Sequence, residues 1–160
     1  MTKMLALLAL ALLASPVAAN GPPQASPLLG SWSVDVSRLP VPPEARPKSV
    51  TMTFSEKQPG TWETKVEIIA SDGSARRMKA TYPLDGTSVP IDGDRLEADS
   101  GAVKMPSPNV MVLALAKGST PASTRIYTVG PDGREMVETA VYFDEKGKAV
   151  MRTNYFNRSR

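Results

Sequence analysis

Residues 50–69, VTMTFSEKQPGTWETKVEII, contain two runs of alternating side chains separated by a turn. Apolar residues occupy most of the alternate positions in both runs: Val50, Met52, Phe54, Trp62, Val66 and Ile68. A period of two places one set of side chains on a buried face and the other set in water. The intervening Gln-Pro-Gly has the composition of a tight turn. The stretch therefore predicts an antiparallel hairpin with one buried face.

The same pattern extends in both directions along the chain. Residues 31–36 and 77–82 alternate in the same way, and Asp-Gly pairs at 72–73, 85–86, 92–93 and 132–133 are typical of hairpin turns. The run Val110–Ala116 (VMVLALA) predicts a strand buried on both faces. We expect an all-β antiparallel meander of about eight to ten strands. A barrel is favoured over the alternative β-sandwich because closure removes exposed sheet edges.

The chain divides into three parts. Residues 1–19 combine a positive start at Lys3, an apolar run and a small-residue cleavage site ending at Ala19, which predicts a signal peptide. The apolar run, residues 4–14, is too short for a membrane anchor, which needs about 20 residues. Residues 20–27 form a Pro-rich tether, and residues 28–160 form the single all-β barrel domain.

Charge and cysteine content limit where the mature protein resides and what it contacts. The chain has no cysteine, so neither a lipid-modified cysteine nor a disulfide can form. Loss of Lys3 reduces nineteen basic side chains to eighteen, against sixteen acidic ones. The resulting charge of +2 is small and scattered, and favours neither nucleic acid nor an acidic membrane as a partner. We expect a periplasmic or secreted protein with no stable membrane insertion after signal cleavage.

Catalytic chemistry is poorly represented. The chain has no histidine and no cysteine, which excludes the usual nucleophilic triads, thiol chemistry and the common zinc, copper and haem ligands. The acidic cluster Asp92, Asp94, Glu97 and Asp99 does not match a calcium loop and includes Arg95. We therefore expect no enzyme, no metal and no cofactor. A hydrolase with two facing carboxylates is the least favoured alternative.

The start of the domain has the sequence Leu29-Gly30-Ser31-Trp32, and later stretches read YPLDG (82–86), VPIDG (89–93), GPDGR (130–134) and AVY (140–142). With these motifs, residues 28–158 resemble small exported bacterial lipocalin-like (calycin-type) β-barrel domains of unknown function. The resemblance implies that a basic residue of the last strand, Arg158 or Arg152, lies over Trp32 and closes the narrow end. It also implies that the Pro-rich loop 39–47 lies at the open end.

The alternating residues that are expected to point into the barrel define a candidate ligand site. The expected lining residues are Met52, Phe54, Trp62, Val66, Ile68, Met78 and Tyr82. In the later strands Val112, Ile126, Val137 and Val141 are also expected to point inward, with Arg152, Asn154 and Tyr155 as a polar anchor. The sequence thus predicts a non-enzymatic protein that binds a small apolar or amphipathic ligand in its barrel.

The alternative function is a structural or protein-interaction module of the cell envelope. Such a module would have a filled barrel, and would use an outer sheet face or the 39–47 loop to contact a partner that the sequence does not identify.

Overall fold

A computed structural model of the chain describes residues 25–159. The predicted signal peptide and residues 20–24 of the tether lie outside the described residues. The strands are β1 (Gly30–Val34), β2 (Ser49–Gln58), β3 (Thr61–Ile69), β4 (Ala75–Pro83), β5 (Asp85–Pro90), β6 (Asp92–Gly93), β7 (Ser100–Ser107), β8 (Val110–Lys117), β9 (Thr120–Val129), β10 (Glu135–Phe143) and β11 (Ala149–Arg158). Two short 3-10 helices, η1 (Val36–Arg38) and η2 (Pro43–Ala45), lie between β1 and β2. No helix among these residues is both long and apolar enough to span a membrane.

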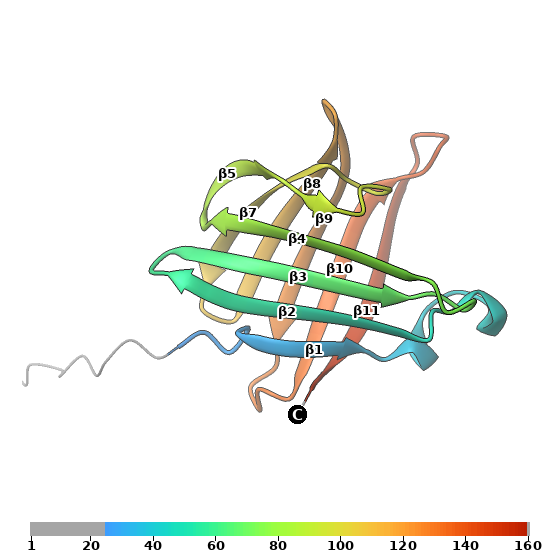
Figure 1. The fold of residues 1–160 in the computed structure, drawn as a ribbon, viewed down its shortest axis with the longest axis horizontal. Coiled ribbons are helices and arrows are strands. Elements are labelled where there is room, and N and C mark those ends of the chain that lie inside the picture. Colours follow the sequence, from blue (N-terminus) through green and yellow to red (C-terminus); the bar gives the residue numbers. More distant parts are fainter. Residues whose placement is uncertain (1–24, 160) are drawn as a thin grey trace, which may run out of the picture.

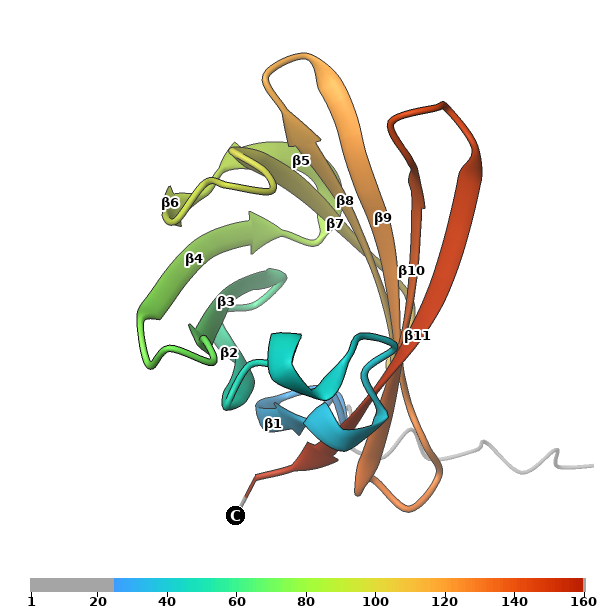
Figure 2. The ribbon, with the colours of Figure 1, turned by 90° about the vertical axis from the view of Figure 1, so that its right-hand side faces the viewer.

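The eleven strands form one antiparallel sheet with the order β5-β7-β8-β9-β10-β11-β1-β2-β3-β4-β6. Strand β1 pairs with both β2 and β11, so the first and last strands lie side by side. The sheet curls into a nearly closed barrel, with β1–β4 crossing in front of β8–β11 in Figure 1 and the two groups on opposite sides in Figure 2. The predicted all-β barrel is therefore confirmed, and the β-sandwich is not formed.

A seam remains where the two ends of the sheet meet. Among the described residues, no strand pairing joins β4 to β5 or β7. The phenol of Tyr82 on β4 instead reaches over Gly101 on β7, where an added Cβ atom would lie 2.9 Å from the Tyr82 oxygen. Side-chain packing thus bridges the seam at this point, and it needs the small glycine.

The narrow end of the barrel is closed by the Gly-x-Trp segment and the last strand. The Arg158 guanidinium lies 4.1 Å from the centre of the Trp32 ring and donates to the carbonyl oxygens of Leu29 (2.8 Å) and Gly133 (2.6 Å). Gly30 has φ +114°, and a Cβ atom there would lie 2.9 Å from Nη1 of Arg158. A glycine is required here both for its backbone conformation and for the space that the guanidinium occupies.

An aromatic core packs next to this closed end. Tyr127 contacts both Phe54 and Phe156 edge to face, with ring centres 5.9 and 6.2 Å apart. Trp62 lies against Phe54 at 6.5 Å. All four rings are almost completely buried. The barrel is therefore solid at the Trp32 end, and the open space lies toward the other end.

The predicted orientation of the later strands is wrong. The four inward candidates alternate with the residues of the inner face and themselves face outward: Val112, Ile126, Val137 and Val141. Strand β8 is buried on one face only, since Met111 and Leu113 are buried and Ala114 is exposed. The prediction failed because the outward residues of these strands are mostly uncharged while the inward ones include Arg125 and Glu138, so the pattern that marks the inside elsewhere is reversed here.

Candidate functional site

A cavity of about 340 Å³ lies inside the barrel, beyond the aromatic core. Its walls come from β2–β4 on one side and from β8–β11 on the other. The segment with η1 and η2 lies across this end of the barrel (Figure 2) and lines the cavity through Leu39, Val41 and Ala45. The volume lies at the lower end of the range for small-molecule pockets.

The wall formed by β2–β4 is mainly apolar. Five of the seven predicted lining residues lie on it: Met52, Val66, Ile68, Met78 and Tyr82. Their side chains share the inner face because β2, β3 and β4 pair in register, with Met52 opposite Val66 and Val66 opposite Met78. Burial raises the pKa of Tyr82 to about 12, so its phenol stays protonated at neutral pH.

The other two predicted lining residues, Phe54 and Trp62, do not line the cavity. On the same inner face, Phe54 lies two positions from Met52 and Trp62 lies four positions from Val66, in both cases toward the closed end. Both side chains belong to the aromatic core. The period of two places a residue on the inner face, but it does not show how far along the barrel the packed core ends.

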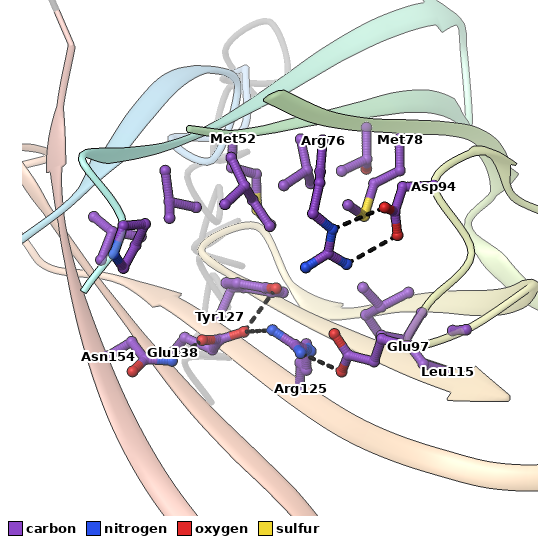
Figure 3. A pocket seen from close by; sticks show the side chains of 18 of the residues that line it. Met52, Arg76, Met78, Asp94, Glu97, Leu115, Arg125, Tyr127, Glu138 and Asn154 are labelled. Atoms are coloured by element: carbon purple, nitrogen blue, oxygen red, sulfur yellow. Dashed lines mark hydrogen bonds and ion pairs between the residues drawn. The ribbon is translucent and has the colours of Figure 1, made fainter. Parts of the chain in front are cut away.

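The opposite wall, formed by β9–β11, carries a polar network centred on Glu138 (Figure 3). Only 1% of Glu138 is exposed. Its carboxylate accepts hydrogen bonds from Arg125 Nη1 at 2.7 Å, from the Tyr127 hydroxyl at 2.9 Å, and from the Asn154 amide nitrogen. Burial and the Glu138 charge both raise the pKa of Tyr127, so this phenol remains a donor. The buried carboxylate is thus held by three donors, as a charge in this environment requires.

Arg125 links this network to the loop before β7. Its Nη2 pairs with Glu97, whose carboxylate also accepts a hydrogen bond from Ser123 at 3.1 Å. Burial raises the pKa of Glu97, but the charge and hydrogen bonds of Arg125 outweigh burial and leave the pKa lowered. Glu97 is therefore an anion at neutral pH, and one guanidinium serves two carboxylates.

A second ion pair lies at the edge of the cavity between β4 and the segment after β6. Arg76 donates from Nε to Asp94 at 2.8 Å and from Nη2 at 2.9 Å (Figure 3). Hydrogen bonds from Arg76 and from the Leu96 backbone hold the pKa of Asp94 well below its usual range. The pair ties the short β6 edge to the barrel where the ladder is only two residues long.

The acidic cluster of the sequence is dispersed in the structure. Asp94 pairs with Arg76, Glu97 pairs with Arg125, and Asp99 accepts from the backbone of Gly118 at 2.9 Å. Over residues 25–159, no three side chains among Asp, Glu, His and Cys lie close enough to hold a metal ion. The acids of this segment act as partners for arginines and for a turn.

The polar anchor expected on β11 is present in part. Arg152 and Asn154 lie on the inner wall of the cavity. Tyr155 does not, because it is on the opposite face of the strand, with the Arg38 guanidinium 3.2 Å from its ring centre. Two atoms of this anchor, Arg152 Nε and Asn154 Oδ1, are buried and have no hydrogen-bond partner.

The central residues of the polar wall, Arg125 and Glu138, are absent from the sequence-based site. The signal that could identify them is a charged residue in phase with buried apolar ones, as in Met136, Glu138 and Ala140. A charge flanked by apolar residues at i±2 indicates an inward position with a partner on a neighbouring strand.

Comparison with known proteins finds similarity only at the level of structure. No family model matches the chain, and no curated protein matches it. A mutant of the fluorescent protein UnaG aligns with TM-score 0.54 and 14% identity, over 84% of this chain and 97% of the other. A Schistosoma mansoni fatty acid binding protein in complex with arachidonic acid aligns with TM-score 0.54 and 17% identity, over 85% and 98%. At these identities the similarity shows the β-barrel fold.

Proposed function

We propose that this chain is an exported, non-enzymatic protein that binds one small apolar or amphipathic molecule inside its barrel. The observation that carries the proposal is the 340 Å³ cavity, which has an apolar wall on β2–β4 and a hydrogen-bonded polar wall on β9–β11. An amphipathic molecule needs both surfaces, one to remove its chain from water and one to satisfy its head group.

The structural neighbours support a binding role. One of them is named as a fatty acid binding protein and holds arachidonic acid, and it aligns over 98% of its length. The cavity of the present chain lies within the same kind of barrel, with Met52 and Met78 on its apolar wall. Methionine side chains adapt to ligands of different shape because they are unbranched and flexible.

The state of the carboxylates supports binding over hydrolysis. A two-carboxylate hydrolase needs one acid that can give up a proton and one that can attack or activate water. Glu138 accepts hydrogen bonds from three side chains, and Glu97 pairs with Arg125 and is held ionised. Both carboxylates are thus engaged with partners on the same wall, so the network suits a fixed structural or recognition role.

Export to the periplasm or beyond the cell is supported by residues 1–19, with their positive start, apolar run and Ala19 cleavage site. The prediction is checked by the N-terminal sequence of the protein recovered from its host's envelope. A start at Asn20 supports it, and an uncleaved chain recovered from the cytoplasm contradicts it.

The binding function is tested with a cavity-filling variant and an outer-face control. We expect native mass spectrometry of protein purified from its own host to show an added small-molecule mass that denaturation releases. Val66→Trp should abolish this mass and the binding of the uncharged fluorescent probe N-phenyl-1-naphthylamine, because residue 66 lies on the cavity wall. Val112→Trp, the same change on the outward face, should retain both.

Circular dichroism of each variant confirms that the barrel has formed. Wild-type protein that carries no ligand and binds no probe would overturn the proposal. Equal loss of binding in both variants would also count against the cavity as the site.

A second candidate function, contact with an envelope protein, is favoured by the outer face of β8–β11. Twelve outward positions there form three cross-strand rows without a charge: Val110, Thr128, Val137 and Tyr155; Val112, Ile126, Thr139 and Thr153; Ala114, Thr124, Val141 and Met151. The filled interior assumed for such a module is absent, since the cavity is open. Cross-linking in the host envelope that yields a defined partner with wild type, but not with Val112→Glu, supports this candidate.

A further inference from the structure

The cavity-facing charges of β9–β11 and the adjoining loop balance one another without a ligand. Arg125 pairs with both Glu97 and Glu138. Arg152 makes no ion pair among the described residues, but its charge lowers the pKa of Glu97. Two guanidinium groups and two carboxylates therefore share this wall, and their formal charges sum to zero. The remaining pair at the cavity edge, Arg76 with Asp94, is balanced as well. Lys79 also lines the cavity, but it lies on β4, in the wall opposite, and is exposed to water.

This balance disfavours an anionic ligand. A carboxylate placed on this wall would bring a third negative charge beside two arginines whose charges are already offset. Uncompensated charge in a poorly hydrated cavity is expensive, because desolvation is not repaid by a partner. A neutral head group leaves the balance intact and only needs its hydrogen bonds satisfied.

The site presents both a hydrogen-bond acceptor without a donor and a hydrogen-bond donor without an acceptor. Asn154 is 5% exposed, and its amide nitrogen donates to Glu138, which fixes its Oδ1 atom as an acceptor without a donor. Arg152 lies two positions away on the same inner face, and its buried Nε is a donor without an acceptor. Buried polar atoms of this kind are rare in native proteins and are usually met by water or by a ligand.

One chemical class satisfies both atoms at once. A primary amide or a hydroxyl-bearing head group offers an acceptor to Arg152 and a donor to Asn154. An ester offers only an acceptor, and a carboxylate offers only acceptors together with a charge. An amide or hydroxyl head group can therefore satisfy both atoms, an ester can satisfy only Arg152, and a carboxylate can do so only by adding a charge.

We propose that the natural ligand is an uncharged amphipathic molecule whose head group both donates and accepts hydrogen bonds, and that Arg152 and Asn154 hold that group. The inference rests on the proposed binding function and names the ligand class for the same cavity. The apolar chain of the ligand lies against Met52 and Met78, on the wall opposite.

The test compares three probes of equal chain length by isothermal titration calorimetry at pH 8: lauramide, methyl laurate and laurate. We expect lauramide to bind about tenfold more tightly than methyl laurate, the difference of one hydrogen bond to a buried acceptor. Laurate should bind most weakly of the three, because it adds a charge and lacks the donor.

Two variants separate charge from hydrogen bonding. Glu97→Gln leaves the wall with one excess positive charge, so the affinity for laurate relative to lauramide should rise at least tenfold. Arg152→Met should weaken lauramide about tenfold through loss of the Nε donor. Lys146→Met, an equivalent change in an exposed turn, should leave all three affinities unchanged.

The outcomes distinguish the two proposals. Laurate binding as tightly as lauramide would overturn the neutral-ligand inference, but it would leave the binding function in place. Equal affinities for lauramide and methyl laurate would overturn the role of Asn154 as an acceptor. Failure of every probe, N-phenyl-1-naphthylamine included, would overturn the binding function and the inference with it.

Discussion

The two walls of the cavity belong to the same sheet but are built on different physical terms. The β2–β4 wall is formed by side chains such as Met52, Val66 and Met78, whose contacts are non-directional. The β9–β11 wall depends on Arg125 and Glu138, whose contacts need particular atoms at particular distances. Because apolar neighbours can readjust and a buried charge cannot, the two walls should differ sharply in their tolerance of substitution.

The largest expected effect is at the centre of the polar wall. Glu138→Leu should lower the free energy of unfolding by about 3–5 kcal/mol, because it leaves the Arg125 guanidinium buried without its inner partner. Urea unfolding measured at pH 7 gives the difference.

The double variant Arg125→Met/Glu138→Leu is its control, since replacing both partners by apolar side chains removes the stranded charge. It should recover at least half of the loss. If Glu138→Leu were as stable as wild type, the polar wall would be as tolerant of substitution as the apolar wall.

An intermediate effect is expected on the apolar wall. Met52→Ala should destabilise by about 2 kcal/mol, at the low end for a buried methionine, because one side of Met52 already faces open space. Met52→Leu keeps the volume and should change stability by less than about 1.5 kcal/mol.

Both values come from the same urea experiment. A Met52→Leu variant as unstable as Glu138→Leu would mean that the apolar wall is as exacting as the polar one.

The smallest effect is the pH dependence of stability that Glu97 contributes on the polar wall. The pKa of Glu97 is lowered in the folded state, so below its ordinary value of 4.5 the unfolded chain binds more protons. The stability that Glu97 contributes is present above that pH and is lost as the pH falls through its folded pKa. The contribution is less than about 1 kcal/mol, because the side chain is 49% exposed and its pairing is screened by water.

Glu97→Gln should therefore flatten the stability curve between pH 5 and pH 3, measured by urea unfolding at each pH. Met52→Leu, on the apolar wall, should run parallel to wild type over the same range. Parallel curves for wild type and Glu97→Gln would contradict the ionised state assigned to this group.

The difference between the walls also explains which inner-face residues could be predicted from the sequence. On β3 the outward residues Glu63, Lys65 and Glu67 are charged, so the inner face was identified and Val66 and Ile68 lie on the cavity wall. On β8–β11 the outward residues are uncharged apart from residues at the strand ends such as Glu135, and the inward ones include Arg125 and Glu138. The usual contrast of apolar inside and charged outside is reversed there, and the predicted faces were wrong for that reason.

The sequence by itself determined the all-β class and the antiparallel hairpins, because local periodicity and turn chemistry suffice to define them. The contact between the Gly-x-Trp segment and the last strand was implied only by the family resemblance, with Arg158 and Arg152 both open, and the structure places Arg158 there. Only the tertiary structure decided which carboxylate meets which arginine, where the aromatic core ends, and which atoms of Arg152 and Asn154 lack partners. Such contacts join strands far apart in the chain, and the energy of a buried charge depends on partners that no local pattern specifies.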